Sequence, residues 1–370
     1  QYYDAPASIE ELKTLDIRTL KGKEGTEEFE LELQDILTDW QSYFNIERGP
    51  LYSIGYLYGY KDGSARLYFA LHHLIVDTVS WRVLTENLKD LYSGKALGFK
   101  GSSYRQWTEA IKSYAKEHEE ERNYWEAVLS DYTEEDTLKD LKINEETLSS
   151  EDIALTVDQT KKLIGESNKA YHTEINDLLL TALGKALSKL TKSSVNHIIL
   201  EGHGREEIDE SLDLTGTLGW FTTLYPVRLE TFEDLGESLK NIKETLRQIP
   251  KKGIGYGSLI GYEKALPRIS FNYLGQFDGG GLDEDKSQWS IVEENSGISM
   301  HQANHDNNII NINGLVINGA LQFNLSTKFD TETTIRLARL FKENLEEVTH
   351  YTTHQTRTYL TVSDVNNIID

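Results

Sequence analysis

Residues 65–81 read ARLYFALHHLIVDTVSW. Up to Val76 the stretch is dense in aromatic and aliphatic residues, which is typical of a buried β-strand that runs into a loop. Leu84, Leu88 and Leu91 then recur at helical spacing and predict a helix with one apolar face. Because predicted strands and helices alternate irregularly along the whole chain, we expect a layered architecture of the α/β or α+β class.

The same patterns locate the other elements. Helices are predicted over 107–129, 175–190, 234–246 and 333–348, and strands over 195–200 and 269–274. Thr173 or Asn176 is the expected N-cap of the second of these helices. Asn313-Gly314 and Asn318-Gly319 are dipeptides typical of two-residue hairpin turns.

The length of 370 residues exceeds what one hydrophobic core usually holds, so we expect two lobes. Residues 131–150 are acidic and poor in apolar side chains, which indicates a linker. The predicted organisation is therefore an N-terminal lobe over residues 1–130, a linker over 131–150 and a C-terminal lobe over 151–370.

Charge and composition exclude several classes of partner. The formal net charge is −23, and an acidic surface of this size repels nucleic acid and anionic membranes. No apolar run approaches the roughly 20 residues that span a bilayer, and the first residues lack the pattern of a signal peptide. The chain has no cysteine, so it has neither disulfides nor a thiolate nucleophile. These features favour a cytoplasmic protein.

A histidine pair lies within the predicted first strand. In a strand, neighbouring side chains point to opposite faces, so His72 and His73 do not easily serve one site together. One is expected to be packed and hydrogen-bonded, and the other free for proton transfer; this arrangement also makes a poor metal chelate. The alternative is two packed core histidines. Asp77, at the turn into the next helix, either fixes that turn or pairs with an arginine.

A second polar group follows a strand at residues 201–206, EGHGRE. A carboxylate at a strand end, with two glycines after it, suits the close approach of a ligand or of another backbone. The alternative is a polar turn whose glycines relieve strain. In residues 269–275, Asn272 and Tyr273 either place polar groups in a cleft or belong to an ordinary strand with a buried tyrosine.

Two further segments indicate packing more than chemistry. The aromatic density of residues 219–226 favours a core segment. The glycine-rich stretch over 253–257 lacks the lysine-serine pair and the surrounding fold of a phosphate-binding loop, so we interpret it as a shaped loop.

Taken together and in order, these segments resemble a known family. Residues 72–81 are similar to the HHxxxDxxSW motif of the condensation superfamily of nonribosomal peptide synthetases, and residues 201–206 resemble the EGHGRE motif of its epimerization domains. Four more segments are similar to the neighbouring motifs, namely 177–184, 219–226, 253–257 and 271–275. Thr78 and Gly216 depart from the family, which usually has glycine and arginine there.

The resemblance implies a fold and a division of labour. It implies two chloramphenicol-acetyltransferase-like lobes that form a V around a central tunnel, with His73 from the first lobe and Glu201 from the second. It further implies that the first lobe lacks about its first 60 residues.

The implied activity is epimerization, from L to D, of the α-carbon of an aminoacyl or peptidyl thioester. The substrate is carried on the phosphopantetheine arm of a peptidyl carrier protein. Because a thioester acidifies the α-hydrogen, no cofactor or metal of the domain's own is expected, and His73 and Glu201 are the implied acid–base pair. His72, Asp77 and Trp81 are implied supports. Asn272 and Tyr273 are candidate donors to the enolate oxygen.

Two alternatives remain open. The first is a condensation domain, which forms an amide and uses His73 without Glu201. The second is a non-catalytic docking domain of the same fold. The partners implied in each case are the carrier protein and neighbouring synthetase modules, and the domain itself is expected to be a monomer.

Overall fold

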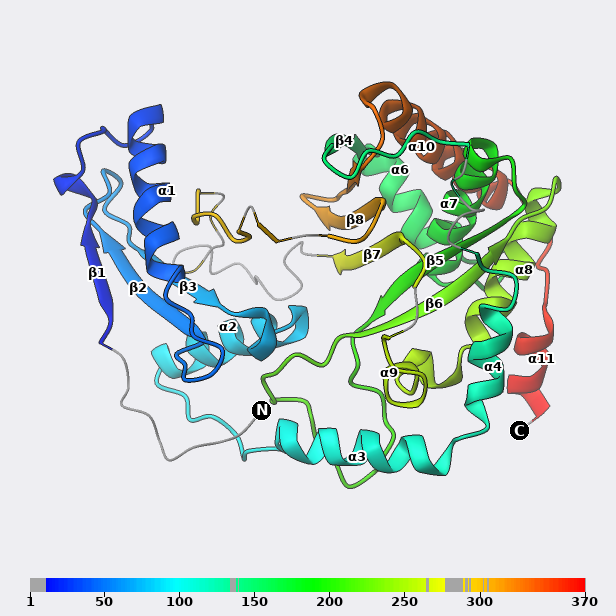
Figure 1. Ribbon diagram of the computed structural model, residues 1–370, viewed down its shortest axis with the longest axis horizontal. Coiled ribbons are helices and arrows are strands. Elements are labelled where there is room, and N and C mark those ends of the chain that lie inside the picture. The colour runs from blue at the N-terminus through cyan, green and yellow to red at the C-terminus, as the bar shows by residue number, and fades with distance from the viewer. Residues whose placement is uncertain are drawn as a thin grey trace. The chain divides into compact units, whose positions relative to one another are not determined.

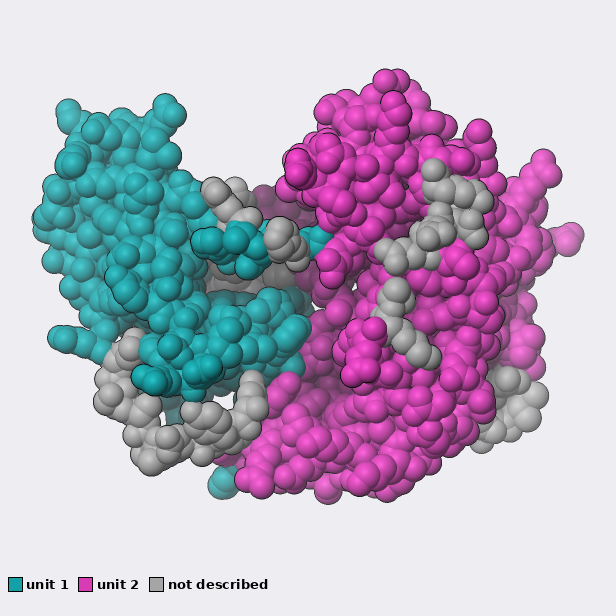
Figure 2. Space-filling model, viewed as in Figure 1, with its two compact units in different colours: residues 1–99, 216–220, 287–306 teal, residues 100–215, 221–286, 307–370 magenta. Residues whose placement is uncertain are grey.

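The computed structural model describes residues 11–133, 138, 140–263, 266–276, 289, 292, 294–301, 303, 304 and 306–369. The chain divides into two compact units, which Figure 2 distinguishes by colour. Unit 1 comprises residues 1–99, 216–220 and 287–306, and unit 2 comprises the remaining three segments. Each unit contains its own β-sheet, and each is described separately below.

Unit 1 is built on a three-stranded sheet in the order β1-β2-β3. The first two strands are parallel and the last two are antiparallel. Its elements in chain order are β1 (Lys13–Asp16), the short helix η1 (Ile17–Thr19), α1 (Glu27–Gln41), β2 (Tyr52–Tyr58), β3 (Arg66–Leu71), the single-turn helix η2 (His73–Ile75) and α2 (Thr78–Tyr92).

The core of unit 1 lies between its sheet and α1. Phe29, Leu33 and Leu37 recur on one face of α1 and are almost fully buried. They pack with Leu57 of β2 and Tyr68 of β3 in one apolar cluster. Thr26 begins the helix because its hydroxyl accepts a hydrogen bond from the backbone N–H of Phe29.

A segment more than 200 residues further along the chain also belongs to unit 1. The Glu294 carboxylate accepts hydrogen bonds from the Arg66 guanidinium over 2.8 Å and from the Tyr60 hydroxyl over 3.1 Å. The Ile298 backbone N–H donates to the Thr38 hydroxyl over 2.9 Å. These contacts fix residues 294–298 to β3 and α1.

Unit 2 is built on a six-stranded sheet in the order β4-β9-β8-β7-β5-β6. The pairs β5–β7 and β7–β8 are parallel and the others antiparallel. Its elements are α3 (Tyr104–Glu117), α4 (Glu121–Val128), β4 (Ser149–Ala154), α6 (Val157–Lys161), the π-helical turn η3 (Lys162–Glu166), α7 (Ile175–Thr191), β5 (Val195–Gly202), β6 (Thr223–Glu230), α8 (Leu235–Arg247), η4 (Pro250–Gly253), α9 (Tyr256–Leu259), β7 (Ile269–Gln276), β8 (Ile310–Ile317), β9 (Ala320–Thr327), α10 (Thr331–Thr353) and α11 (Val362–Ile369).

Helices α7, α8 and α10 pack against one face of this sheet (Figure 1), where every second strand residue is buried. In β8, for example, Ile310, Ile312 and Val316 point into the core. The residues between them therefore belong to the opposite face. On that opposite face the central strands carry polar side chains, including Asn313 and Glu201.

Most predicted elements match the structure, with longer ends. The helix predicted over 175–190 is α7, but its N-cap is Glu174 rather than Thr173 or Asn176. Glu174 and Asp177 form a capping box, and the Asp177 carboxylate also pairs with Arg247 over 2.8 Å. An acidic capping residue was overlooked because serine, threonine and asparagine are the commoner choices.

One of the two predicted hairpin turns is wrong. Asn318 and Gly319 connect β8 to β9, and their φ values of 51° and 75° are those of a two-residue turn. Asn313-Gly314 lies inside β8 instead. Gly314 is needed there because a Cβ atom at this position would lie 2.0 Å from the Phe323 ring.

The long helix predicted over 107–129 is also wrong, because the chain leaves helical geometry at His118 and separates α3 from α4. The division into units differs from the predicted lobes as well, since residues 100–130 belong to unit 2. Trp107 and Tyr114 of α3 pack there with Phe221 and Ile254.

Two kinds of feature are absent from the described part of the chain. None of its helices combines the length and the apolar character needed to cross a membrane. Nor do three or more histidine, aspartate or glutamate side chains gather there as they would around a metal ion.

Candidate active site

The histidine pair lies just after β3 and not within it. His72 precedes the η2 turn, and its Nδ1 accepts a hydrogen bond from the Leu74 backbone N–H over 3.2 Å. The His72 ring lies edge-on to Phe44. The expectation that both histidines belong to the strand is wrong, because β3 ends at Leu71. Instead, His72 is the N-cap of η2 and His73 is its first residue.

His73 begins this turn and is exposed. Its ring lies edge-on to the indole of Trp220, with 5.0 Å between the ring centroids. Trp81 lies one helical turn into α2 and is half-buried. Thus His72 is held by a hydrogen bond and packing, whereas His73 presents its imidazole at the surface beside an aromatic ring.

Asp77 is the N-cap of α2 and is buried. Its Oδ1 accepts a hydrogen bond from the Ser80 backbone N–H over 2.7 Å, so it fixes the turn into the helix. The Ser80 hydroxyl donates to the Gly219 carbonyl over 2.9 Å and accepts from the Gly219 N–H over 3.1 Å. This pair of hydrogen bonds attaches residues 216–220, and with them Trp220, to the helix that follows the histidines.

In unit 2, Glu201 lies near the end of β5 and is exposed. The side-chain amide of Asn272, on the adjacent strand β7, donates a hydrogen bond to its Oε2 over 2.7 Å. This contact follows from the register, since Ile199 pairs with Ser270 two residues earlier. The parallel pairing therefore brings together two motifs that are 71 residues apart.

Tyr273 follows Asn272 and has the opposite orientation. It pairs with Gly314 on the helix-covered face, and its ring packs against the core of unit 2. Burial raises the pKa of its hydroxyl. The strand pairing shifts between Tyr273 and Gln276, as in a β-bulge. The structure thus brings Asn272 to Glu201 and places Tyr273 on the other face of the strand.

The glycines after Glu201 allow close packing. A Cβ atom on Gly202 would lie 2.8 Å from the Thr223 hydroxyl. Gly204 has a φ of 66°, and a Cβ atom there would lie 1.6 Å from the Phe221 carbonyl oxygen. Only glycine fits the second position, because both the conformation and the space exclude a side chain.

The charged residues of this motif hold the loop. The His203 Nδ1 accepts from the Arg205 N–H over 3.0 Å, and its Nε2 lies 2.9 Å from Glu206 Oε1. Burial alone raises the pKa of Glu206, but the hydrogen bond with His203 and the charges of His203, Lys252 and Lys251 together outweigh it and lower the pKa. The Arg205 guanidinium stacks on the Phe221 ring at 3.8 Å and donates to the Leu214 carbonyl.

The glycine-rich segment at 253–257 is also a shaped loop. Gly253 has a φ of 82°, and the Tyr225 ring occupies the place of a Cβ atom at 2.1 Å. Gly255 packs beside Glu121 and Tyr114, whose hydroxyl donates to the Glu121 carboxylate. These contacts explain the glycines by packing.

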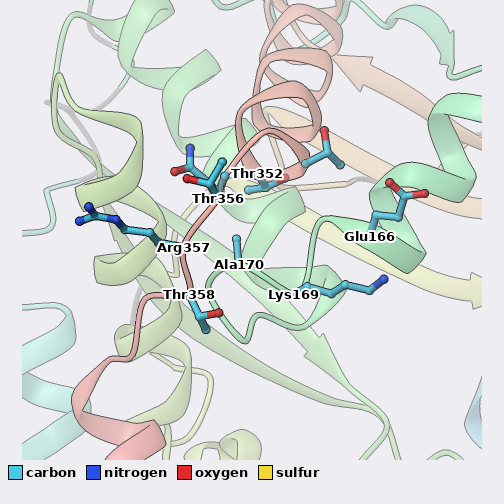
Figure 3. Close-up of a pocket in the computed structure, with 9 residues that line it drawn as sticks. Glu166, Lys169, Ala170, Thr352, Thr356, Arg357 and Thr358 are labelled. Atoms are coloured by element: carbon cyan, nitrogen blue, oxygen red, sulfur yellow. The ribbon is translucent and has the colours of Figure 1, made fainter.

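A polar pocket of about 240 Å³ lies elsewhere in unit 2, at the C-terminal end of α10 (Figure 3). Its lining includes Glu166, Lys169 and Arg357 but none of the motif residues. In Figure 3 the side chains of Lys169 and Arg357 extend away from each other. Because the two cations do not converge, we assign no ligand to this pocket.

Trp220 and Ser80 are the contacts that sequence reasoning missed. We interpreted residues 219–226 as core packing, and part of the segment is core, since Phe221 is buried. The indole of Trp220 instead lies against His73. The two segments are more than 130 residues apart, and sequence spacing alone does not connect them.

The candidate residues thus form one group in each unit. His72, His73, Asp77 and Trp81 lie in unit 1, and Glu201, Asn272 and Tyr273 lie in unit 2. The unit 1 group offers an exposed imidazole, and the unit 2 group an exposed carboxylate oriented by an amide. An imidazole and a carboxylate are the two side chains most used for proton transfer near neutral pH.

The chain matches proteins of known families. The family model for the Condensation domain matches residues 1–368. The chain is 42% identical, over 294 residues, to the N-(5-amino-5-carboxypentanoyl)-L-cysteinyl-D-valine synthase of Amycolatopsis lactamdurans, which covers 79% of the chain and 8% of that protein. It is 37% identical to bacitracin synthase 3 of Bacillus licheniformis, over 96% of the chain and 6% of that protein. The chain therefore spans less than a tenth of these relatives.

Solved structures agree in fold. The epimerization domain from the third module of tyrocidine synthetase B is 30% identical and superposes with a TM-score of 0.81, over 93% of this chain and 81% of that one. The condensation domain of the monacolin K polyketide synthase superposes with a TM-score of 0.69 at 16% identity, over 92% and 80% of the two chains. The predicted mixed α/β fold, with two chloramphenicol-acetyltransferase-like lobes, is confirmed by these neighbours. The chain belongs to the condensation-domain family of nonribosomal peptide synthetases.

Proposed function

We propose that this domain epimerizes the α-carbon of an aminoacyl or peptidyl thioester. The thioester is carried on the phosphopantetheine arm of a peptidyl carrier protein. The observation that carries the proposal is the exposed Glu201 carboxylate, held by the Asn272 amide at the end of β5 within the EGHGRE motif. Amide formation does not require a carboxylate at this place, whereas inversion of a carbon requires a second proton-transfer group.

The names of two similar proteins agree with this activity. One solved structure is described as an epimerization domain, and it shares 30% identity with this chain. One relative is named for a product that contains D-valine. Both are properties of those proteins, and they support the same assignment here.

In the proposed reaction, the thioester carbonyl lowers the energy of the enolate that forms when the α-proton leaves. Glu201 takes this proton, the negative charge moves onto the thioester oxygen, and the His73 imidazolium delivers a proton to the opposite face of the carbon. Glu201 is then protonated and His73 neutral, and exchange with water restores both. The direction of use is reversible, so either group can be the base for the L-form.

The other motif residues have supporting roles in this proposal. Asn272 orients the carboxylate, His72 and Asp77 fix the turn that carries His73, and Trp81 belongs to the helix that Asp77 caps. Tyr273 supports the strand from its core side. We further propose that the domain acts as a cytoplasmic monomer beside its carrier protein and the neighbouring modules.

Deuterium exchange tests the proposed function. A carrier protein loaded with an L-aminoacyl group is incubated with the domain in deuterated water. Exchange at the α-position, with formation of the D-form, is the expected result. Glu201→Gln is expected to lower the rate by about 10²-fold or more, and His73→Ala by a similar factor. Absence of exchange with the wild-type domain contradicts epimerization and leaves the condensation and docking roles.

Condensation is the second candidate, because the matching family model is that of the condensation domain. The same Glu201→Gln variant separates the two functions. Amide formation between two loaded carriers is expected to survive this substitution if the domain is a condensation enzyme. If Glu201→Gln loses exchange, and neither this variant nor the wild-type domain forms an amide, the result supports epimerization.

A further inference from the structure

A row of polar side chains crosses the unit 2 sheet. Asp152 pairs with Asn324, Asn324 with Asn313, and Asn313 with Asn272, which in turn hydrogen-bonds Glu201. Residues directly opposite each other on neighbouring strands lie on the same face. These five residues therefore form one continuous polar row from β4 to β5.

The polar row lies on the face opposite the core. Asp152, Asn324, Asn313 and Glu201 are exposed and Asn272 is half-buried. In the two strands at the middle of the row, the residues on either side are buried: Phe323 and Leu325 flank Asn324, and Ile312 and Gly314 flank Asn313. Asparagine and aspartate are depleted in β-strands. Three asparagines side by side at the centre of a sheet are therefore not explained by the needs of the strands.

Hydrogen bonds divide the row into two occupied ends and a vacant middle. Asn272 is bound to Glu201, and Asn324 Nδ2 donates to Asp152 over 2.7 Å and to Ser150 over 2.8 Å. The Asn324 Oδ1 accepts from the Ser326 hydroxyl over 3.0 Å and keeps one lone pair for a further donor. In the described part of the chain, the Asn313 side chain has no hydrogen-bond partner. A carboxamide offers both donors and an acceptor, so Asn313 suits a secondary amide, which needs one of each.

The spacing of the row matches one particular chain of amides. Neighbouring strands lie about 4.8 Å apart, so Asn313 is about 10 Å and Asn324 about 14 Å from Glu201 across the sheet. The two amides of a phosphopantetheine arm are separated by a β-alanyl unit. This unit has one methylene more than the repeat of about 3.5 Å in an extended peptide, so its amides are spaced by about 4.8 Å. The amides of an ordinary peptide recur too closely for this match.

We infer that the polar row binds the phosphopantetheine arm of the carrier protein, a role that rests on the proposed function. With the thioester carbon at Glu201, the amide next to the thioester lies at Asn313, and the second amide donates its N–H to the remaining lone pair of Asn324 Oδ1. The hydroxyl group beyond them reaches Asp152, which accepts its hydrogen bond. The arm is uncharged between its thioester and its phosphate, and neutral carboxamides bind such a chain without competing for protons.

Two thioesters of the same L-aminoacyl group test the role of the row. One is an ethyl thioester, which has no amide beyond the sulfur, and the other is a pantetheine thioester. The rate of α-proton exchange in deuterated water, measured with the full chain at several substrate concentrations, gives KM for each thioester. Asn313→Ala and Asn324→Ala are each expected to raise the ratio of the pantetheine KM to the ethyl KM by about 3- to 10-fold, the effect of one lost hydrogen bond.

Gln322→Ala is the matched control. Gln322 is an exposed amide on the same strand and face as Asn324, two residues away and outside the row. It is expected to leave the KM ratio unchanged. Asn313→Leu, which has a similar shape without hydrogen-bonding groups, repeats the test if the alanine variant unfolds at a lower temperature than the wild-type chain.

The outcomes separate the row from the proposed function. If both asparagine variants leave the KM ratio unchanged and Glu201→Gln is inactive, the binding role of the row is overturned and the proposed function stands. A third substrate, a peptidyl ethyl thioester, distinguishes the peptide from the arm. If the asparagine variants raise KM for this substrate alone, the row binds the peptide, and this result also overturns the assignment. Binding of phosphopantetheine itself, followed by saturation-transfer NMR, is expected to be lost in the Asn313→Ala/Asn324→Ala variant. Because this readout needs no exchange, it supports the row even where the proposed function fails.

Discussion

The side-chain amide of Asn272 donates a hydrogen bond to Oε2 of Glu201 over 2.7 Å, across the parallel pair of β5 and β7. The amide fixes the direction of the carboxylate and, having no titratable proton, does not compete for the proton that Glu201 is proposed to move. Glu201 is the exposed residue near the end of the otherwise buried strand β5, and without a partner its side chain would have many rotamers. Asn272 is thus a positioning residue in the proposed reaction.

Substitution of Asn272 is expected to affect both the rate and its pH dependence. Asn272→Ala removes a hydrogen bond to a charged group, and kcat for α-proton exchange should fall by roughly 10- to 100-fold. Asn272→Asp places a second carboxylate beside Glu201, so the acid limb of the pH–rate profile should move to higher pH. Ser270→Ala, two residues earlier on the same strand face, is the control. A lower rate in Asn272→Asp with an unmoved profile contradicts the positioning role.

Gly204 is expected to tolerate no side chain. Its positive φ and the Phe221 carbonyl oxygen at 1.6 Å from an added Cβ atom both oppose alanine. Gly204→Ala should lower the free energy of unfolding by about 2–4 kcal/mol in urea titrations. Gly216→Ala, where no atom lies within 4 Å of an added Cβ, should change it by less than about 0.5 kcal/mol. Equal effects of the two substitutions contradict this explanation.

Ser80 is expected to hold the segment that carries Trp220. Ser80→Ala removes both hydrogen bonds to Gly219. The N–H and carbonyl of Gly219 then lack these partners in a buried place. The loss should cost about 1–3 kcal/mol of stability and raise the hydrogen-exchange rate of the Gly219 amide. Thr85→Ala is the control, since among the described residues the Thr85 hydroxyl bonds only to carbonyls of its own helix. Unchanged exchange at Gly219 contradicts the prediction.

His197 is expected to make stability depend on pH. It is buried, with Nε2 3.1 Å from the Val128 carbonyl and 3.0 Å from Asp131. Burial lowers the pKa of His197, and the opposing charge of Asp131 does not outweigh it. The folded protein keeps this imidazole neutral, so below about pH 6.5 the unfolded chain binds more protons and stability falls as the pH drops.

Thermal unfolding between pH 7.5 and 5.5 measures this effect. The wild-type midpoint should fall by a few degrees more than that of His197→Gln, which has no proton to gain over this range. Parallel curves for the two proteins show that other groups cause the pH dependence.

The sequence predicted the elements of the fold better than their pairing. Hydrophobic periodicity located α7 and β5 because their buried faces repeat at fixed spacing. It missed the break between α3 and α4, since α4 continues the apolar pattern after three polar residues. The grouping of α3 with unit 2 depends on contacts of Trp107 with Phe221, which are 114 positions apart and have no local signal.

The candidate site shows the same limit. The sequence motifs identified Glu201 and Asn272 as candidates, but the hydrogen bond between them depends on the order of the strands in the sheet. Local reasoning on alternation put His72 and His73 in a strand, whereas the chain turns after Leu71. The polar row was not foreseen, because its members come from five strands and become neighbours only through their registers.

Unit 1 is assembled from three separate stretches of the chain, of which the last includes Glu294, bound to Arg66 and Tyr60. During synthesis, the ribosome must therefore make some 230 further residues before this ion pair can close. Until then residues 11–99 lack their contacts with residues 294–298. Incompletely assembled units of this kind are substrates for chaperones. For the same reason, an engineer who exchanges lobes between synthetases cannot cut at residue 99 alone, because the graft would leave part of unit 1 behind.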